Sequence, residues 1–419
     1  MSINTEFEIP SGTLSLTRYP VKHQHKSLQA WDSADQLVLA HINNNPSIWV
    51  TKQQDLPLAT DGGLADITIF NDEFGALACG LLSLNPSLNI VCVSDSWISH
   101  KATQKNLQRN EITKHVTFKT STDDTPNAAV ILIKVPRSLA LLELQLAQIS
   151  QTTAKGTHII AAAKVTALKP SVFKLFEKYL GAVTTSLAKK KSRLLFCDNE
   201  KYQLPSPRFP TAFTTDKSET GIGLTLVNHA NVFSRQSLDL GARFMLKSLP
   251  DLSSNPKAHV IDLGCGNGVL GIALLARYPQ ISMTFVDESF MAIESAQLSV
   301  EKNLPDALNR CRFVATNCLE GISSDKDTIV DLVICNPPFH QQNTVTEHIA
   351  WQMFHDAFSI LTHGGELRVV ANRHLPHAET LKKRFGGVSV VASERKFVIL
   401  SAVKKIISVW GAVKLPENQ

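Results

Sequence analysis

Short apolar runs rich in β-forming residues alternate, in the second half of the chain, with segments in which apolar positions recur at helical spacing. The runs lie at Val260 to Leu263, Met283 to Val286, Cys311 to Val314, Leu332 to Ile334 and Glu366 to Val370. Strands that are apolar on both faces are covered on both sides, and a helix between two such strands makes a parallel crossover. The pattern therefore predicts a parallel α/β sheet.

Two of the intervening segments are predicted to be helices. Val269 to Tyr278 has apolar residues on all sides and ends before Pro279, whereas Met291 to Val300 is amphipathic and ends near Asn303. Proline cannot continue a helix, and an amphipathic helix buries only one face. We expect both helices to pack on the sheet as crossover connections.

The first half of the chain repeats this plan more faintly, and the offsets between matching pieces stay nearly constant. The pairs are Ile67 to Gly75 with Val260 to Gly266, Val91 to Ser96 with Phe285 to Ser289, Leu132 to Arg137 with Val333 to Phe339, His158 to Lys164 with Glu366 to Asn372, and Lys189 to Leu194 with Ser393 to Val398. Self-similarity of this kind indicates a tandem duplication.

The length of the chain agrees with two domains. A chain of 419 residues exceeds one ordinary core, and 43% hydrophobic against 19% charged residues can bury two cores. The segment 198–220 is rich in Pro, Ser and Thr and has no clear periodicity. We predict a first domain at 1–197, a linker at 198–220 and a second domain at 221–419, and we assign no role to the apolar tail at 406–419.

Charge and cysteine usage narrow the class of protein only slightly. The formal net charge of +5 permits an anionic partner but is lower than that of a dedicated nucleic-acid binder. The cysteines are Cys79, Cys92, Cys197, Cys265, Cys311, Cys318 and Cys335. Their odd number and scatter predict small core residues, with neither disulfides nor a metal site. The sequence contains no apolar run long enough to span a membrane, and Met1 to Pro10 has no apolar signal core. We therefore expect no membrane contact and a cytoplasmic location.

The first candidate site is the turn that follows the first strand of the second copy. It reads V-I-D-L-G-C-G-N-G from Val260 to Gly268. Gly264, Gly266 and Gly268 permit positive φ angles and let a ligand approach the backbone closely. The spacing D-x-G-x-G-x-G differs from the G-x-G-x-x-G of dinucleotide-binding folds, which argues against a nicotinamide-dependent dehydrogenase.

Polar residues at the ends of the next two strands point to a nucleoside cofactor. Asp287 ends the second strand in F-V-D-E-S, where a carboxylate can accept hydrogen bonds from both ribose hydroxyls. Asn317, just after the third strand, can bond the amino group of adenine. The alternatives are purely structural roles: a helix-cap carboxylate for Asp262, a solvated charge for Asp287 and an ordinary turn residue for Asn317. The combination of motifs disfavours these alternatives.

The motif N-P-P-F at Asn336 to Phe339 directly follows the fourth strand of the second copy. Two prolines make a stiff, projecting loop. The exocyclic amine of a base is a poor nucleophile because its lone pair is delocalised, and the Asn336 side-chain oxygen and the Pro337 carbonyl can each accept one amine hydrogen. Pro338 stiffens the loop, and Phe339 offers a face for an unstacked base. A rigid turn is the alternative, and His340 is expected only to pack beside the site.

With both motifs present, the chain resembles the class I methyltransferases that act on amino groups of bases or of glutamine. Four further stretches look like the ribosomal RNA guanine-N2 methyltransferases: N-H-A-N-V-F-S-R from Asn228, L-D-L-G-A-R-F from Leu238, N-P-P-F-H-Q-Q from Asn336 and W-Q-M-F-H from Trp351. L-Q-A-W-D-S-A-D from Leu28 and V-A-N-R-H-L from Val370 are closer to the large-subunit enzymes than to the small-subunit ones. The resemblance covers the chain up to Lys405.

This resemblance implies a tandem duplication of the class I, Rossmann-like methyltransferase fold, with mixed seven-stranded sheets. S-adenosylmethionine would be the cofactor, held by Asp262, Gly264, Cys265, Gly266, Asn267, Gly268, Asp287, Glu288 and Asn317. Phe233, Ser234 and Asp239 would help to close its pocket, and Asn336 to Phe339 would hold a guanine. The expected substrate is protein-free 23S ribosomal RNA, and the internal duplication favours a monomer.

The first copy departs from the pattern where chemistry would need it. Only one glycine survives in Asn71 to Gly75, and Lys134 to Arg137 (K-V-P-R) has lost the asparagine and the second proline. We expect this domain to be catalytically inactive and to bind RNA phosphates. The candidate contacts are Lys134, Arg137, Lys164, Lys189, Lys190, Lys191 and Arg193. A purely structural domain with solvated charges is the alternative.

Three other functions remain open from the sequence. Methylation of a protein glutamine uses the same N-P-P motif, and methylation of guanine N2 in 16S ribosomal RNA would use the same site. A non-enzymatic RNA-binding protein would keep only the fold. The intact glycine turn and Asn336 argue against the last of these.

Overall fold

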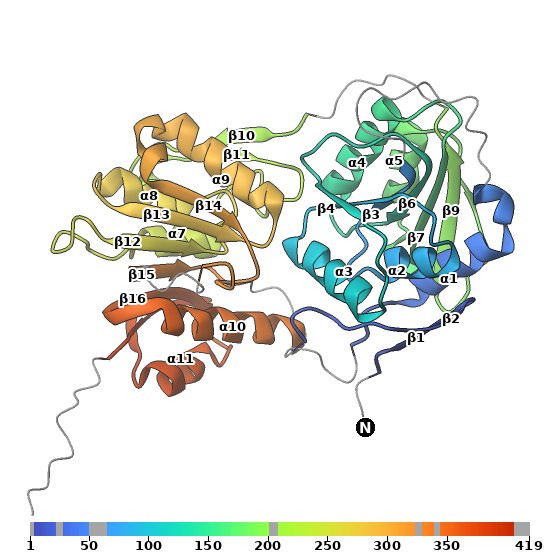
Figure 1. Ribbon diagram of the computed structural model, residues 1–419. Coiled ribbons are helices and arrows are strands. Elements are labelled where there is room, and N and C mark those ends of the chain that lie inside the picture. The colour runs from blue at the N-terminus through green and yellow to red at the C-terminus, as the bar shows by residue number, and fades with distance from the viewer. Residues whose placement is uncertain are drawn as a thin grey trace, which may run out of the picture. The chain divides into compact units, whose positions relative to one another are not determined.

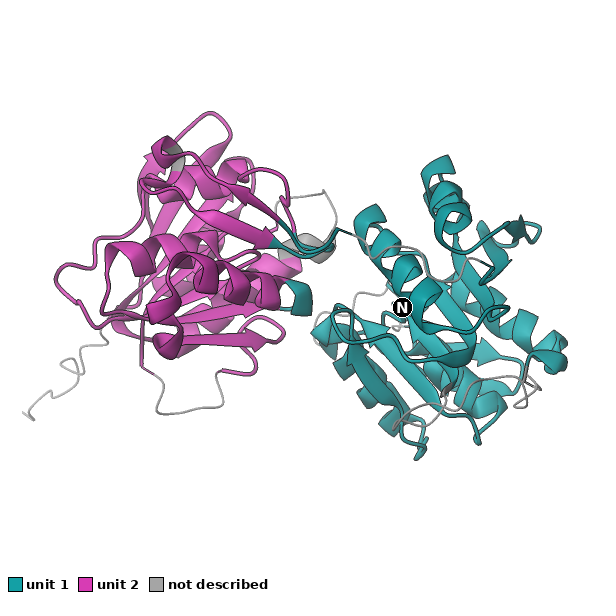
Figure 2. Cartoon of the chain, turned by 90° about the horizontal axis from the view of Figure 1, so that it is seen from above, with its two compact units in different colours: residues 1–211, 228–232, 288–291 teal, residues 212–227, 233–287, 292–419 magenta. Residues whose placement is uncertain are grey.

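The computed structural model describes residues 4–21, 28–49, 65–200, 208–322, 329–338 and 344–405. These residues form two compact units (Figure 2). Unit 1 comprises Met1–Thr211 with the short segments Asn228–Val232 and Glu288–Met291, and unit 2 comprises Ala212–Val227, Phe233–Asp287 and Ala292–Gln419. Each unit contains one seven-stranded sheet.

The sheet of unit 1 has the strand order β5-β4-β3-β6-β7-β9-β8. Its strands are β3 (Ala65–Phe70), β4 (Ile90–Ser94), β5 (Thr117–Thr120), β6 (Ala128–Lys134), β7 (His158–Lys164), β8 (Thr184–Thr185) and β9 (Ser192–Asp198). The first five of these are parallel, and β9 runs antiparallel to both of its neighbours. A separate hairpin, β1 (Glu6–Ile9) and β2 (Gly12–Ser15), precedes the sheet.

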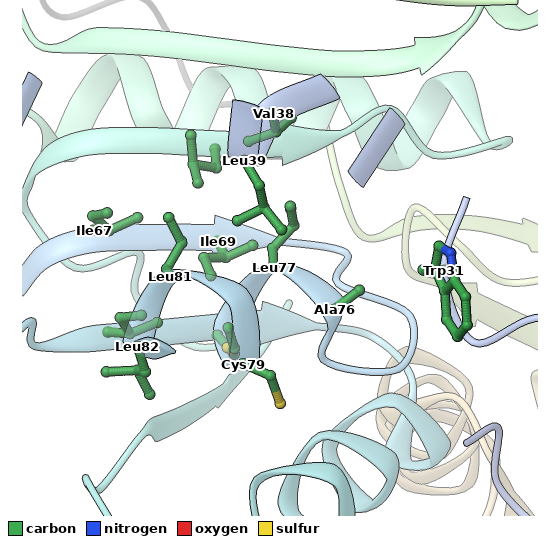
Figure 3. Packing of buried hydrophobic residues seen from close by; sticks show 14 of the residues in the cluster. Trp31, Val38, Leu39, Ile67, Ile69, Ala76, Leu77, Cys79, Leu81 and Leu82 are labelled. Carbon is green, nitrogen blue, oxygen red and sulfur yellow. The ribbon is translucent and has the colours of Figure 1, made fainter. Parts of the chain in front are cut away.

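Helices cover both faces of this sheet (Figure 1). They are α1 (Ser33–Asn44), α2 (Ala76–Leu84), α3 (Trp97–Arg109), α4 (Leu139–Thr152) and α5 (Pro170–Tyr179), with short 3-10 turns at Pro46–Trp49 and Val165–Ala167. On one face, residues such as Leu39 of α1 and Leu77 of α2 pack against Ile69 (Figure 3). On the other face, α4 and α5 cover a second core that contains Ile133 and Phe176.

The sheet of unit 2 has the same plan, in the order β14-β13-β12-β15-β16-β18-β17. Its strands are β12 (His259–Leu263), β13 (Ser282–Asp287), β14 (Cys311–Ala315), β15 (Val330–Cys335), β16 (Leu361–Asn372), β17 (Ser389–Ser393) and β18 (Phe397–Val403). The helices are α6 (Lys217–Thr220), α7 (Leu240–Leu246), α8 (Val269–Arg277), α9 (Phe290–Asn303), α10 (Thr344–Ile360) and α11 (His377–Phe385), and a 3-10 turn spans Pro305–Arg310. A hairpin of β10 (Thr211–Thr214) and β11 (Thr225–Asn228) precedes the sheet.

The fold class predicted from the sequence is confirmed: each unit carries the mixed seven-stranded sheet with covering helices. The strands predicted for the second copy lie inside the observed ones, but the fifth is longer than predicted, because β16 begins at Leu361. The segment predicted as a linker, 198–220, contains β10 and α6. Polar strand residues on a short hairpin leave no hydrophobic periodicity to detect. The domain boundaries themselves remain a prediction.

Matching hydrogen bonds in the two units support the duplication. In unit 1 the Asn110 side chain accepts a bond from the Ser15 amide at 2.7 Å and donates to the Ser15 carbonyl at 2.8 Å. In unit 2 the Asn303 side chain does the same with Thr225, at 2.8 and 2.7 Å. In both units an asparagine at the end of the second crossover helix thus holds the hairpin that precedes the sheet.

The cysteines lie where the sequence predicted them: six are buried and Cys311 is half-buried, and all seven are free thiols. None of the helices in the part of the chain that the structure describes combines the length and hydropathy needed to cross a bilayer.

Candidate active site

The glycine turn after β12 adopts the conformation that its sequence predicts. The φ angles of Gly264, Gly266 and Gly268 are 73°, 55° and 80°, values that side-chain-bearing residues rarely adopt. The amide of Gly264 donates to the Val286 carbonyl at 2.8 Å, which ties the turn to β13. A Cβ atom built on Gly266 would meet nothing within 4 Å. At Gly266 the turn therefore presents bare backbone to open space, as a bound ligand requires, whereas Gly264 and Gly268 face Met353 and Ala296.

Asp262 supports this turn from inside the protein. It is 1% exposed, and its Oδ2 accepts a hydrogen bond from the Gly271 amide at 2.9 Å. Gly271 is the third residue of α8, whose N-cap Gly268 has no side chain to offer, so Asp262 satisfies an amide that a capping residue ordinarily would. Burial raises the pKa of the carboxyl to about 8, against the lowering effect of the Gly271 bond and with a raising contribution from Asp287. Direct contact of Asp262 with a cofactor stays a prediction.

Gly271 is a residue that sequence analysis missed. A Cβ atom at this position would lie 2.4 Å from Cε1 of Phe285, so only glycine lets α8 pack on β13. The available signal was a lone glycine inside an otherwise apolar helix, which indicates a close packing contact.

Asp287 lies across the glycine turn. It ends β13, is half-buried, and its Oδ2 accepts a hydrogen bond from the Gly266 amide at 3.0 Å. The turn and the carboxylate predicted to bind ribose are thus brought together. Glu288, also predicted to contact the cofactor, belongs to unit 1, where its Oε2 accepts a bond from Ser96 Oγ at 2.6 Å. The contact of Glu288 with the cofactor stays a prediction.

The remaining predicted cofactor residues lie in or near the same turn. Cys265 and Asn267 are 7% and 8% exposed, and burial raises the pKa of the Cys265 thiol well above its ordinary value. Asn317 follows β14, is 4% exposed and donates from Nδ2 to Glu320 Oε2 at 3.3 Å. Phe233 is 57% exposed and Ser234 has a φ of 56°. The roles of these residues stay predictions.

The side chain of Asn336 is held in one orientation by Asp239. Asn336 Nδ2 donates to Asp239 Oδ2 at 3.1 Å. Asp239 is the N-cap of α7, and the same Oδ2 accepts the Ala242 amide at 3.0 Å. Asn336 Oδ1 is buried and has no hydrogen-bond partner among the described residues. A buried acceptor without a partner is costly, so this oxygen is poised for a donor supplied by a ligand.

Sequence analysis had placed Asp239 at the cofactor pocket, whereas its observed partner is the candidate catalytic asparagine. In the rest of the motif, Pro337 is buried and Pro338 is exposed. Phe339 and His340 lie outside the described residues.

Unit 1 has lost the corresponding cradle. Gly75 begins α2 with a φ of 80°, as Gly268 begins α8, and alignment on these two residues places Asn71, with a φ of 63°, where Gly264 stands. The Asp72 side chain accepts the Ala78 amide at 2.9 Å, which repeats the Asp262 bond to α8 from a different backbone position. Asp72 therefore stands in the turn itself, where unit 2 has Cys265.

The sequence repeat matched Asp95 to Asp287, but Phe70 pairs with Val93 as Leu263 pairs with Val286, so Ser94 stands at the Asp287 position. The Glu288 position is that of Asp95, whose carboxylate is committed to other groups. Asp95 is 4% exposed, and its carboxylate accepts bonds from Ser289 Oγ, Asn231 Nδ2 and the Met291 amide, each at 2.7 Å within unit 1. Its oxygens are thus used inside the protein. Two of the three turn glycines are also absent, so the described residues of unit 1 hold no equivalent of the open turn of unit 2.

The structure corrects one predicted RNA contact, Lys134. Phe70 pairs with Ile133 in unit 1 as Leu263 pairs with Cys335 in unit 2, so Lys134 stands at the position of Asn336. Its Nζ lies 2.8 Å from Asp32 and 2.6 Å from Asp35, and its side chain is 14% exposed. Burial lowers the pKa of Lys134, but the two carboxylates more than offset it and leave the pKa above its ordinary value. A lysine that is paired and largely buried is not available to a phosphate.

The other basic candidates differ in exposure. Arg137, Lys164, Lys189, Lys190 and Lys191 are exposed. Arg193 is half-buried and its Nε is buried without a partner in the described part of the chain. The exposed residues remain candidates for RNA contact.

Comparison with known proteins relates both halves of the chain to established families. Residues 4–201 match the family described as RLMG N-terminal domain, and residues 223–401 match the methyltransferase small domain. A protein of Pseudoalteromonas atlantica named ribosomal RNA large subunit methyltransferase G is 46% identical over 96% of this chain and 100% of the relative. A Klebsiella pneumoniae protein of the same name is 44% identical over 96% of this chain and 98% of the relative.

A solved structure shares the fold of the whole chain. It is the T. thermophilus 16S rRNA N2 G1207 methyltransferase, RsmC, in complex with AdoMet and guanosine. The TM-score is 0.71 at 18% identity, and the match covers 96% of this chain and 98% of that one.

Proposed function

The chain belongs to the family of ribosomal RNA large subunit methyltransferase G, and from this premise we propose that it methylates the exocyclic N2 amine of one guanine in 23S ribosomal RNA. The methyl donor is S-adenosylmethionine, bound in unit 2. Unit 1 performs no methyl transfer.

The observation that carries this proposal is the free Oδ1 of Asn336. Asp239 accepts one hydrogen bond from the side-chain amide of Asn336, and Asn336 Oδ1 is buried without a partner among the described residues. An exocyclic amine is the complementary group, because it brings hydrogens to donate and has a lone pair that must be turned out of the ring plane. Asn336 Oδ1 and the Pro337 carbonyl would accept the two amine hydrogens, and a preorganised acceptor needs no reorganisation during the reaction.

The residues of unit 2 fit the cofactor. The open space beside Gly266 leaves the backbone accessible, and Asp287 lies directly across the turn. We assign the ribose to Asp287, the adenine to Asn317 and the backbone contacts to Gly264 through Gly268. Phe233 and Ser234 would cover the pocket.

When bound, S-adenosylmethionine supplies a sulfonium methyl group: the guanine N2 forms the new bond to carbon, the carbon–sulfur electron pair stays on sulfur, and one amine proton passes to water. The protein contributes orientation through Asn336 and Pro337 and needs no strong base. Phe339 would carry the unstacked guanine on its ring face.

Membership of the large-subunit family favours 23S over 16S ribosomal RNA and over a glutamine amide. We further propose that the substrate is protein-free RNA and that the enzyme acts as a monomer in the cytoplasm. The internal duplication supports the monomer, since one chain already supplies two copies of the fold.

The test uses purified protein, methyl-labelled S-adenosylmethionine and unmodified 23S and 16S RNAs, each alone and as assembled subunits. Nucleosides from each RNA are then separated by mass spectrometry. Labelled N2-methylguanosine from free 23S RNA alone is the expected result. Label only in 16S RNA, only in assembled subunits, or in no RNA despite cofactor binding would contradict the corresponding part of the proposal.

A further inference from the structure

We infer that unit 1 holds a nucleotide-binding groove for single-stranded RNA, formed by α1, the turn after β1 and the turn that joins β8 to β9. This inference rests on the proposed function for the identity of the RNA. The groove is a hollow of about 210 Å³. Its lining residues are Glu8, Ile9, Pro10, Ser33, Gln36, Leu37, Ala40, Lys189 and Lys190.

Three segments that are distant in the sequence meet at this hollow. Ser33, Gln36, Leu37 and Ala40 form one half-buried stripe of α1, and Figure 1 shows α1 beside β9 and the β1–β2 hairpin. Ser33 Oγ lies 2.7 Å from Ser192 Oγ, and Lys190 Nζ donates to Gln36 Oε1 at 3.1 Å. These bonds tie the lysine turn to the helix.

The lining divides into a floor for a base and a rim for a phosphate. Ile9, Pro10, Leu37 and Ala40 give an apolar floor, and the volume equals that of about seven water molecules. Lys189 and Lys190 supply positive charge at the rim. Glu8 is the one carboxylate among the lining residues; it would repel a phosphate but can accept a bond from a base N–H group.

The backbone of the lysine turn is strained. Lys189 and Ser192 exchange backbone hydrogen bonds at 2.8 and 2.9 Å, and the two residues between them, Lys190 and Lys191, have φ angles of 49° and 63°. A two-residue hairpin turn with two positive φ angles favours Asn-Gly, and lysine is strained at both positions. Strain that keeps Lys190, which lines the groove, and its neighbour Lys191 in a place suited to asparagine and glycine points to a use for the charge.

The surroundings of the groove leave the lysine turn accessible to a ligand. Lys164 pairs with Ser192 in the sheet register, so the turn lies at the carboxyl edge of the parallel strands, where this class of sheet binds its ligands. Among the described residues, no carboxylate lies within ion-pair distance of Lys189, Lys190 or Lys191. Leu187, two residues before the turn, is 89% exposed and offers an uncovered apolar contact.

The experiment measures binding of a fluorescein-labelled single-stranded RNA 12-mer to the full chain by fluorescence anisotropy, across a series of KCl concentrations. Lys189→Ala/Lys190→Ala should reduce the slope of log Kd against log salt by about 1.4, because each phosphate contact on a single strand contributes about 0.7. The matched control is Lys169→Ala/Lys174→Ala, which removes the same charge from exposed lysines at and within α5, on the opposite face of the sheet.

A second variant tests the hollow without changing charge. Ala40→Phe should fill the floor and weaken RNA binding about tenfold while leaving the salt slope unchanged, the scale expected for the loss of one base contact. The inference would be overturned if the two double-lysine variants had the same slope of log Kd against log salt. Wild-type RNA affinity in Ala40→Phe would also overturn it. Calorimetric binding of S-adenosylmethionine and methylation of 23S RNA are measured in parallel. RNA binding that follows these variants while wild-type protein methylates no RNA would refute the proposed function and leave the groove standing.

Discussion

Asn336 Nδ2 and Asp239 Oδ2 lie 3.1 Å apart, and this contact fixes which end of the asparagine amide is left for a substrate. The corresponding positions in unit 1 are also in contact, since Lys134 at the Asn336 position binds Asp32, the N-cap of α1, at 2.8 Å. The duplication has therefore kept a link between a helix N-cap and the residue after the fourth strand. In unit 2 that link leaves Asn336 Oδ1 without a partner in the described part of the chain, whereas in unit 1 the Lys134 side chain is held in an ion pair.

Asn336→Ala should lower kcat by at least about 100-fold, the loss that follows removal of one positioned polar group from a transition state. Cofactor affinity should stay near that of the wild type, because Asn336 is assigned to the amine. Single-turnover methylation measures the loss of rate, and calorimetric titration with S-adenosylmethionine measures the cofactor affinity. Retained turnover would refute the assignment.

Asp239→Ser should lower kcat without unfolding α7. Serine is as good an N-cap as aspartate, so the bond to the Ala242 amide is preserved, but its side chain is too short to reach Asn336 as well. We expect a drop in kcat of about tenfold or more with an unchanged Kd for the cofactor, consistent with the loss of a hydrogen bond to a charged group. In a double-mutant cycle with Asn336→Ala the two effects should be strongly non-additive. Additive losses would show that Asp239 acts independently of Asn336.

Asp262→Asn should change the pH dependence of the stability of unit 2 in the cofactor-free protein. The pKa of Asp262 is raised to about 8 in the folded state, so between about pH 4 and 8 the folded state binds a proton that the unfolded state has lost. Stability from this group is therefore present at low pH and falls as pH rises toward 8, by at most about 1.4 kcal/mol per pH unit.

Asparagine keeps an oxygen for the Gly271 amide and does not titrate. The opening free energy of α8 amides, measured by hydrogen exchange at pH 5.5 and 8, should accordingly fall less in Asp262→Asn than in the wild type. Identical pH slopes in the two proteins would contradict the assignment.

Gly271→Ala should destabilise unit 2 by about 1 to 3 kcal/mol, because the new Cβ would stand 2.4 Å from Phe285 and overpack the core. The displaced helix should also weaken cofactor binding through the glycine turn. Thermal unfolding and cofactor titration measure both effects. Gly223→Ala is the matched control, since its Cβ would have ordinary contacts at 3.8 Å, and an equal loss in both variants would contradict the packing argument.

Lys134→Met should destabilise unit 1 by about 3 to 5 kcal/mol at pH 8, because Asp32 and the buried Asp35 would lose their cation. The pKa of Asp35 is already raised to about 7, chiefly by burial, and removing Lys134 raises it further. The carboxyl is then protonated at pH 5, so the loss should be smaller there. Denaturation at the two pH values checks this, and Lys134→Met/Asp35→Asn should regain part of the stability at pH 8. A pH-independent loss would argue against the buried ion pair.

The sequence by itself determined the architecture, the duplication and the chemical class of the site. Alternating apolar runs predict the sheets because periodicity is a local property of the sequence. The glycine turn and the N-P-P motif can be recognised in the sequence because backbone conformation and proline stiffness depend on individual residues. The loss of glycines between Asn71 and Gly75 likewise showed that the first copy had changed.

Tertiary structure alone decided which polar groups meet. Three contacts depend on strand register, helix placement and side-chain rotamer. They are those of Asp239 with Asn336, of Asp262 with Gly271, and of Lys134 with Asp32 and Asp35. The sequence predicted Lys134 to be a surface cation, whereas in the fold Lys134 belongs to a largely buried ion pair. Local patterns cannot predict such a change, because the free energy of a charge depends on the groups that surround it.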